Sequence, residues 1–301
     1  MPYGFETIIL VTGAPRTGTT PVGNLLAAAP GAHAIYEPWG PTGDRRFLDR
    51  FPIFPSADTA GPRIQSFLDD LSQLKLKLKP QTRPYHAHQS PFRRAILAIS
   101  GTRTLSSLRA ARFARRKKTL IWKDPNAILA LPDILDRGIE VVVTVRPALA
   151  HAASYKRLGW SPDLADIYPR YARRYGPDFL IEDTLGHAGP PPAVGAAALW
   201  RMAYSLVARQ ITQPNLSLVH SNALAKDEEG TYKALFGHLK LDFEAAAGVI
   251  RRRRDDDGQA PRNSTAVHDW NRPVFHTNTY WKDVLDPGEI DAVIRLTDGV
   301  L

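Results

Sequence analysis

The sequence of 301 residues contains no cysteine, which excludes disulfide bonds, thiolate metal ligands and a cysteine nucleophile. It also lacks any apolar run that approaches the ~20 residues of a membrane-spanning helix. Residues 1–12 have neither the basic start, the long apolar core nor the small-residue cleavage site of a signal peptide. We therefore expect a cytoplasmic protein without a transmembrane segment.

Negative charge is scarce, because 39 Lys and Arg face 30 Asp and Glu and leave a formal net charge of +9. Such an excess attracts anions such as nucleotides, nucleic acids, acidic glycans or a lipid surface. Two runs carry much of it, RFARRKK at residues 112–118 and IRRRRDDDG at residues 250–258. Most runs of this kind are solvated surface, so the charge alone does not select a partner.

Five short segments rich in β-branched and aliphatic residues have the composition of strands, and continuous apolar runs among them suit strands buried on both faces. These segments are Thr7–Thr12, Ala32–Glu37, Thr119–Lys123, Ile139–Val145 and Leu216–Ser221. Helical patterns cover Val22–Ala29, Asn126–Arg137, Leu149–Arg157 and Ala193–Gln213. Alternation of strands and helices predicts an α/β fold, with a P-loop-like parallel sheet of about five strands flanked by helices.

Residues 41–118 interrupt this alternation. The segment is rich in proline and arginine and contains one short amphipathic piece, IQSFLDDLSQLKLKL. We interpret it as a variable basic insertion over the binding face, on the acceptor side of a single domain spanning residues 1–301. Residues 255–279 are polar and basic, and we expect them to form a loop before a final helix near Pro287–Leu296.

The stretch ILVTGAPRTGTTPVGNLL at residues 9–26 runs from a predicted strand through a glycine-flanked loop into a helical pattern. The two flanking glycines have the spacing of a GxxxxGK[ST] phosphate-binding loop, in which backbone N–H groups and a helix N-terminus hold the anion. The alternative is a tight turn without a ligand. The residues expected to bind phosphate are Gly13, Pro15, Arg16, Thr17, Gly18, Thr19 and Thr20.

This loop lacks its lysine, because Thr19 occupies that position, and it contains an arginine, Arg16. The lysine of P-loop NTPases contacts the β- and γ-phosphates, so ATP or GTP hydrolysis is a poor fit. Asp124 could pass for a magnesium-binding aspartate, but Lys123 directly precedes it. A guanidinium suits the bridging oxygens of an anhydride. Transfer of a group with one negative charge needs less neutralisation than γ-phosphoryl transfer, so we expect no metal.

A second pattern, VVVTVRPALAHAASYKRLGW at residues 141–160, places Arg146 at the carboxyl end of a buried strand. Ser154 follows eight residues later, on the next helix. Ligands of open parallel sheets bind beyond the carboxyl ends of the strands, so Arg146 should share an edge with the loop. An arginine with a nearby serine hydroxyl could clamp a second phosphate. The alternative is that Arg146 only caps its strand.

Jointly, GAPRTGTTPVGNLL and VVVTVRPALAHAAS resemble the 5′-phosphosulfate loop and the 3′-phosphate-binding strand, turn and helix of one enzyme family. This family is the sulfotransferases that use 3′-phosphoadenosine 5′-phosphosulfate (PAPS), and IWKDP resembles a strand of its tyrosylprotein and related Golgi-type members. The resemblance covers about a third of the chain and does not extend to residues 41–118. One departure is Pro147, directly after Arg146, where many members have another residue first.

The resemblance implies a P-loop-type fold with five parallel strands, PAPS as sulfuryl donor and 3′-phosphoadenosine 5′-phosphate (PAP) as product. Arg16 would act on the leaving phosphate, while Arg146 and Ser154 would bind the 3′-phosphate. RNSTAVHDW and NTYWKDVL resemble the family's last segment, a basic loop over the nucleotide, with a solvated loop as the equal alternative. The residues implied there are Arg262 and Ser264 as 3′-phosphate contacts and Trp270 or Trp281 as support.

Sulfuryl transfer to a hydroxyl needs a general base. Glu37, in AIYEPWG, ends a predicted strand and lies close to the loop if that strand is beside the first. Similar Glu-Pro segments carry the proposed base in carbohydrate-type and tyrosylprotein-like sulfotransferases. The alternatives are His33, His151 and His268. The pair His86 and His88 has no third metal ligand in register.

The sequence therefore predicts a sulfotransferase that transfers a sulfuryl group from PAPS to a hydroxyl or amine acceptor. The acceptor classes left open are a carbohydrate such as an anionic glycan, a glycolipid and a small alcohol. Peripheral contact with the inner membrane surface is compatible with the basic charge, and we expect no nucleic-acid partner. The rival hypotheses are a small-molecule or nucleotide kinase with a degenerate P-loop, and a non-catalytic nucleotide- or anion-binding protein.

Overall fold

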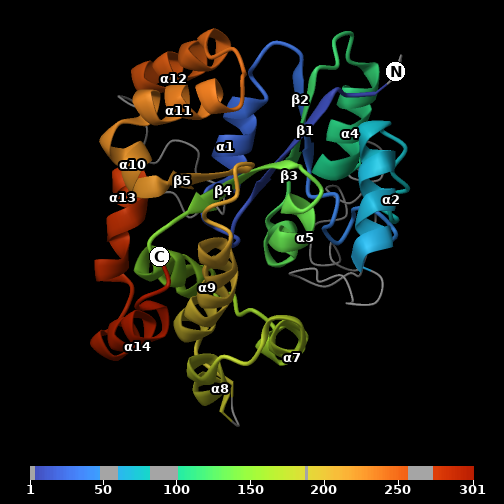
Figure 1. Cartoon of the computed structure of the whole chain (residues 1–301). Coiled ribbons are helices and arrows are strands. Elements are labelled where there is room, and N and C mark those ends of the chain that lie inside the picture. Colours follow the sequence, from blue (N-terminus) through green and yellow to red (C-terminus); the bar gives the residue numbers. More distant parts are fainter. Residues whose placement is uncertain (1–3, 48–59, 82–100, 187–188, 257–273) are drawn as a thin grey trace.

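A five-stranded parallel sheet forms the centre of the computed structural model, which describes residues 4–47, 60–81, 101–186, 189–256 and 274–301 (Figure 1). The strands are β1 (Thr7–Thr12), β2 (Ala32–Tyr36), β3 (Thr119–Lys123), β4 (Glu140–Val145) and β5 (Leu216–His220). Their order is β2-β3-β1-β4-β5, and every neighbouring pair is parallel. The predicted fold class is confirmed, and each strand lies within one residue of its predicted bounds.

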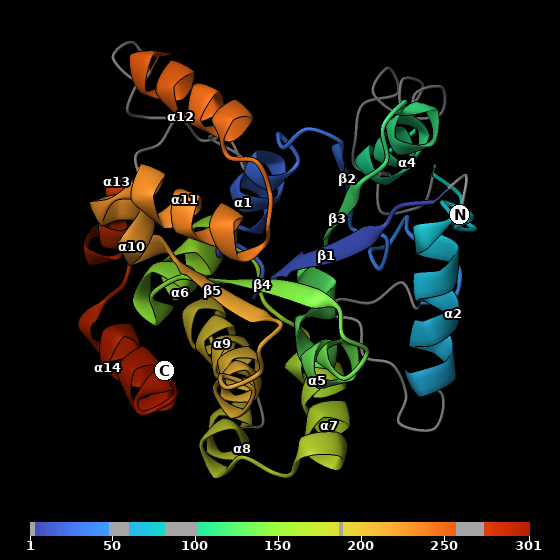
Figure 2. The same cartoon turned by 45° about the horizontal axis from the view of Figure 1, so that its top comes forward.

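Helices cover both faces of this sheet, because alternate side chains of each strand point to opposite sides. Leu10, Trp122 and Val141 pack into one core, whereas Ile9 and Val11 pack into the other. The first face is covered by α2 (Ala60–Ser72), α5 (Leu131–Leu135), α7 (Leu164–Tyr175), α8 (Phe179–Leu185) and α9 (Pro192–Arg209) (Figure 2). The second is covered by α1 (Thr19–Leu26), α11 (Glu228–His238) and α12 (Glu244–Asp256).

The C-terminal elements pack against helix α6 (Ala148–Leu158) and α9 through a third apolar cluster. These elements are the 3-10 turn η4 (Tyr280–Asp283) and α14 (Pro287–Thr297), and the short helix α13 (Val274–Thr279) precedes them. Small side chains such as Ala153 and Ala197 let α6 and α9 approach each other closely. Helix α14 begins with a capping box formed by Asp286 and Glu289.

Several predicted boundaries are wrong. Helix α1 begins three residues early because Gly18 adopts the left-handed conformation that caps it, with φ of 97°. Residues 274–279 are helical and α12 continues to Asp256, so both ends of the predicted loop 255–279 are wrong, and its middle lies outside the described residues. The predicted helix 126–137 is a 3-10 turn, η2 (Pro125–Ala130), followed by α5, because Asp124 caps the turn and Pro132 restarts the helix.

The segment 41–118 contains α2 and α4 (Arg103–Phe113), and its described part contributes to the main core. Phe67 of α2 lies against Trp39 and Trp122, with ring centroids 5.7 and 5.0 Å apart. Helix α4 packs against β2 through Leu108 and its neighbours. Within the described ranges, no helix is both long enough and apolar enough to span a membrane.

The strand order reverses direction between β1 and β4, as it does at the topological switch point of other open parallel sheets. From β1 the chain passes through α1 to the outer strand β2 and returns to β3; it then crosses to β4 on the other side of β1. The helix after β1 covers one face, whereas α6, after β4, packs against α9 on the other. Ligands of doubly wound sheets bind where such helices diverge, outside the carboxyl ends of the strands.

Candidate functional site

The loop after β1 is shaped by contacts that only glycine permits at Gly13. A Cβ atom built there would lie 2.6 Å from the Thr144 carbonyl oxygen and 2.7 Å from Thr17 Oγ1. Arg16 has a φ of 75°, in the left-handed region that a non-glycine residue rarely adopts. Neighbouring contacts therefore hold the backbone of this loop in one strained shape.

Two of the loop's expected phosphate donors serve the loop itself. The Thr17 N–H donates to the Ala14 carbonyl at 3.2 Å, and the buried Thr17 hydroxyl contacts Ala14 O and Thr144 Oγ1 at 2.6 and 2.9 Å. The first hydrogen bond of α1 runs from Val22 N–H to Gly18 O. The N–H groups that precede it, on Gly18, Thr19 and Thr20, point out of the helix N-terminus, where an anion is favoured.

Arg16 and Arg146 meet beside this loop. Arg146 Nη1 donates to the Arg16 carbonyl at 3.1 Å, and Arg16 Nε donates to Ser154 Oγ at 3.2 Å. Arg146 Nη2 also donates to the Thr277 carbonyl of α13. The structure thus brings three sequence-predicted binding residues together, with the Arg16 guanidinium on the Ser154 side of the loop.

Among the residues that the structure describes, no acidic side chain forms an ion pair with either of these two arginines. Burial, and then the charge of Arg146, lower the pKa of Arg16; burial also lowers the pKa of Arg146. Arg146 is buried, and its Nε atom has no partner among the residues that the structure describes. A buried and a partly buried arginine so close in the fold favour an anion that offsets their repulsion and desolvation.

Helix α9 fixes the end of β4 that carries Arg146. Trp200 Nε1 donates to the Arg146 carbonyl at 2.9 Å, and the Tyr204 hydroxyl donates to the Thr144 carbonyl at 2.7 Å. The side chains of Trp200 and Tyr204 both pack within the main core. The guanidinium therefore projects from a rigid element, as a preorganised anion site requires.

His151 is not a general base, contrary to one alternative from the sequence. The side chain is fully buried under the loop, and Nε2 lies 3.0 Å from the Pro15 carbonyl. Burial, followed by the charge of Arg146, lowers the pKa of His151 to about 3. The neutral ring donates its Nε2 proton to Pro15 and supports the buried side of the loop. His33 also fails as a base, because it lies at the amino end of β2, against the Arg116 carbonyl.

A pH-dependent loss of stability is expected from His151. The ring is neutral in the folded protein, whereas the unfolded chain takes up a proton near the ordinary pKa of 6.5. Stability therefore falls as the pH drops from about 7 toward 3. Between pH 7 and pH 5 the wild type should lose about 2 kcal/mol more free energy of unfolding than His151→Leu. Urea unfolding of both proteins at the two pH values measures this difference, and identical pH dependences would contradict it.

Glu37 lies directly after β2, on the other side of the loop from Arg146. The condition under which Glu37 would lie next to the loop, a strand directly beside β1, is not met, because β3 lies between β2 and β1. Glu37 Oε1 instead forms an ion pair with Lys123 Nζ at 2.6 Å, and the Glu37 N–H donates to the Lys123 carbonyl at 2.7 Å. The Glu37 side chain is 44% exposed, whereas that of Lys123 is buried. The carboxylate is thus held in place yet accessible to a second molecule.

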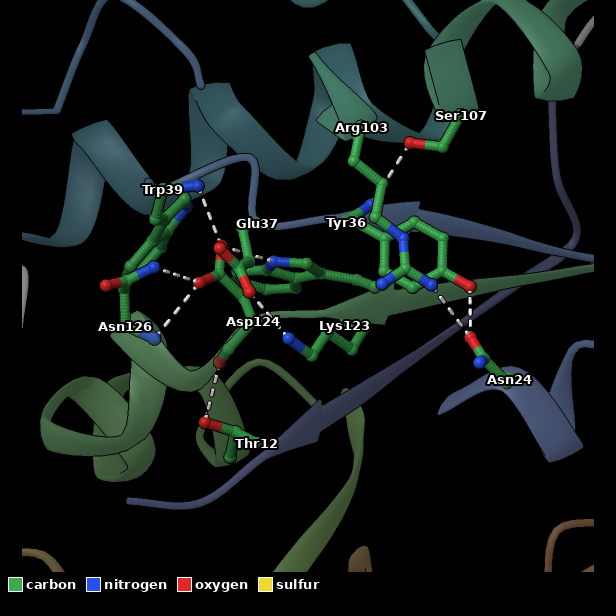
Figure 3. Close-up of polar contacts among 11 residues, drawn as sticks. Thr12, Asn24, Tyr36, Glu37, Trp39, Arg103, Ser107, Lys123, Asp124 and Asn126 are labelled. Carbon is green, nitrogen blue, oxygen red and sulfur yellow. Dashed lines mark hydrogen bonds and ion pairs between the residues drawn. The ribbon is translucent and has the colours of Figure 1, made fainter. Parts of the chain in front are cut away.

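Asp124 organises the turn that presents Glu37 (Figure 3). One of its oxygens accepts bonds from the Trp39 N–H at 2.7 Å and Trp122 Nε1 at 3.3 Å. The other accepts the Asn126 N–H and Nδ2, at 3.0 and 2.8 Å. Burial, and then the Glu37 charge, raise the pKa of Asp124 to about 6. Four donors saturate this carboxylate, so it is committed to structure rather than to a magnesium ion.

A small polar group flanks Glu37 on its outer side (Figure 3). The Tyr36 hydroxyl donates to Asn24 Oδ1, and the Arg103 guanidinium lies over the Tyr36 ring, 3.7 Å from its centroid. Sequence reasoning did not assign these residues to the site, and it considered Lys123 only as the neighbour of Asp124. The structure explains Gly23 of α1, where a Cβ would lie 3.1 Å from Lys123 Cγ, but no local sequence pattern pairs these two positions.

The candidate functional groups lie in one row along the carboxyl edge of the sheet. From β2 to β4, the order is Glu37, Lys123, the loop that follows β1 and Arg146 with Ser154. Trp281 lies in η4. The predicted residues outside the described ranges are His86, His88, Arg262, Ser264, His268 and Trp270.

Neither a protein-family model nor a curated protein matches the chain. Solved structures similar to it include the sulfotransferase domain of the Synechococcus PCC 7002 olefin synthase, with 16% identity over 98% of this chain and 94% of that one and a TM-score of 0.46. Sulfotransferase STF9 from Mycobacterium avium is 14% identical, and the match covers 94% of this chain and 76% of that one, with a TM-score of 0.40. Mouse sulfotransferase SULT7A1, complexed with PAP, is 12% identical, and the match covers 98% of this chain and 84% of that one, with a TM-score of 0.42. All three are sulfotransferases, the family that the sequence motifs resemble.

Proposed function

We propose that this protein is a sulfotransferase that transfers a sulfuryl group from PAPS to a hydroxyl or amine group of an acceptor. The observation that carries this proposal is the row of groups along one sheet edge. A loop without the P-loop lysine lies between two arginines that form no ion pair within the described ranges and an accessible carboxylate–lysine pair. Two anion sites beside one candidate base suit a donor with two separate phosphate groups.

The residues present fit such a donor. The N–H groups of Gly18, Thr19 and Thr20 would hold the 5′-phosphosulfate, and Arg146 with Ser154 would hold the 3′-phosphate. The unpartnered Arg146 Nε is the specific observation that favours an anion there. When bound, PAPS supplies the sulfuryl group and a phosphate leaving group.

Glu37 is the base in this proposal. Its carboxylate is exposed enough to meet an acceptor hydroxyl, and Lys123 holds one oxygen in place. After Glu37 takes the acceptor proton, the Lys123 ammonium loses its ionic partner and is free to stabilise negative charge beside the loop. Arg16 acts from the opposite side, where its permanent charge stabilises the leaving phosphate oxygen.

The acceptor is a hydroxylated molecule in this proposal, and the classes to screen are carbohydrates, glycolipids and small alcohols. The polar group of Asn24, Tyr36 and Arg103 next to Glu37 offers hydrogen bonds to such a molecule. Glycans and glycolipids present many hydroxyl groups, whereas a small alcohol presents few. Screening acceptors of graded size therefore separates these classes.

Selective binding of PAP is the first expected result. In a thermal-shift titration without Mg²⁺, PAP should stabilise the protein more than ADP or ATP, because only PAP has a 3′-phosphate for Arg146. Loss of a charge-assisted hydrogen bond costs about 1.5–3 kcal/mol, so Arg146→Ala should weaken PAP binding about 10- to 100-fold. Binding to ADP should change little.

Two variants make this experiment decisive. Ser154→Ala removes one hydroxyl without removing the buried guanidinium, and should weaken PAP binding in the same direction while the protein stays folded. Arg173→Ala, at an exposed position on α7, removes the same charge and should leave PAP binding unchanged. An equal response to all three nucleotides, or a response only to Mg²⁺-ATP, would overturn the proposal and favour a kinase. Tight PAP binding without turnover on any acceptor would favour a non-catalytic binding protein.

A further inference from the structure

The C-terminal end of α4 and the segment that leads into β3 carry a dense positive surface. Residues 101–123 contain no Asp or Glu. We name as the α4 basic surface the residues Arg109, Arg112, Phe113, Arg115, Arg116 and Lys117. None of its cations forms an ion pair within the described part of the chain.

The geometry of α4 turns these side chains outward. Thr104, Leu108 and Ala111 are buried on its inner side. Arg109 and Phe113 lie on the outer side, and Phe113 is 86% exposed. Arg112 lies at the flank of the helix, where its Nε donates to the Leu74 carbonyl at 2.9 Å. An aromatic side chain left in water at the centre of a cationic cluster loses the stabilisation that burial would give it.

The α4 basic surface is held in place by the sheet. The Lys118 carbonyl accepts the N–H groups of Glu6 and Thr7, and the Lys118 N–H donates to the Gly31 carbonyl at 3.0 Å. Arg116 is fixed through its own carbonyl, which lies 2.8 Å from His33 Nε2. The cations therefore form a prebuilt surface rather than a loose tail.

This surface lies at the end of the sheet opposite the candidate active site. Residues 114–118 precede β3 and thus lie at the amino edge, whereas Glu37 and the phosphate-binding loop lie at the carboxyl edge. The α4 basic surface is therefore too far from the candidate active site to bind the proposed sulfuryl donor, and its charge indicates a different anionic partner.

We propose that the α4 basic surface docks the protein on an anionic lipid bilayer. The cations bind phosphate headgroups, and Phe113 inserts at the level where aromatic rings are favoured at a membrane interface. The single projecting aromatic favours a lipid surface over a nucleic acid, for which several interleaved stacking side chains are typical. This inference goes beyond the proposed function and does not depend on it. Docking would leave the carboxyl edge, with Glu37, facing the aqueous phase.

Co-sedimentation with large unilamellar vesicles tests the proposal. The full chain should bind vesicles of 30% phosphatidylglycerol and 70% phosphatidylcholine, and should not bind pure phosphatidylcholine. Each basic residue near an anionic surface contributes ~1 kcal/mol, so Arg115→Gln/Arg116→Gln should lower the affinity about 30-fold. Phe113→Ser should lower it about 10-fold, through loss of apolar burial without a change in charge.

A matched control separates a local surface from net charge. Arg251→Gln/Arg252→Gln changes two exposed arginines on α12 and lowers the net charge by the same amount. This control should keep wild-type vesicle binding. Equal losses in both double variants, or no loss in Phe113→Ser, would overturn the proposal. So would stronger binding to a duplex oligonucleotide than to the vesicles. Thermal unfolding and PAP binding should be unchanged in all these variants, which separates failure of docking from failure of the proposed function.

Discussion

Arg16→Ala is expected to lower kcat for sulfuryl transfer about 10²- to 10³-fold, because one preorganised donor at a developing oxyanion contributes ~3–4 kcal/mol. The preorganisation is visible in the structure. Arg146 fixes the Arg16 carbonyl at 3.1 Å, and the Arg16 guanidinium lies 5.8 Å from the centroid of the Trp160 ring. The measurement is PAP formed from PAPS with the best acceptor from a panel of sugars, glycolipids and simple alcohols.

The position of Arg16 next to Ser154 gives this experiment a second arm. Should Arg16 also contact the 3′-phosphate, Arg16→Ala weakens PAP binding as well as turnover, whereas a role confined to the leaving oxygen lowers kcat alone. Arg16→Lys keeps the charge but loses the planar fork, and should recover only part of the loss. Ser154→Ala tests the observed contact from its other partner. A loss below threefold in Arg16→Ala would remove Arg16 from the mechanism.

Local sequence determines the phosphate-binding loop, and for that reason the loop and its flanking elements could be predicted. Gly13 and Gly18 have fixed spacing between an apolar strand and a helix, and each is required by a close contact or a positive φ. Arg146 and Ser154 could also be predicted as neighbours, since both follow one buried strand. Their placement beside the loop then follows from a general property of parallel sheets.

The carboxylate side of the site could not be predicted in the same way. The partners Glu37 and Lys123 are 86 residues apart in sequence, and they meet because β2 pairs with β3 in the register Tyr36↔Lys123. No local pattern encodes that register or the order of the strands. Likewise, the contact from Arg16 to Ser154 spans 138 residues. The sequence indicated which residues were chemically competent, and the strand order decided which of them meet.

Glu37→Gln is expected to lower kcat about 10²- to 10⁴-fold, the usual contribution of a positioned general base. The amide keeps the size of the side chain and can still contact Lys123, but it cannot accept the acceptor proton. Affinity for PAP should remain at the wild-type value, because Glu37 lies across the loop from Arg146. The measurement combines initial rates of PAP formation with a thermal-shift titration of PAP on the same preparation.

Asp183→Asn is the matched control, because it removes one carboxylate at an exposed position on α8 and should leave kcat unchanged. Lys123→Met completes the set: it leaves Glu37 without its ionic partner, so the rate should fall although the base is retained. Lower rates in Glu37→Gln and Lys123→Met, both with intact PAP affinity, would place the chemistry at the junction of β2 and β3. Wild-type turnover in Glu37→Gln would exclude this carboxylate as the base and require another proton acceptor at the carboxyl edge. The His151 ring could not take that role, because its Nε2 is engaged by Pro15 and its pKa lies at about 3.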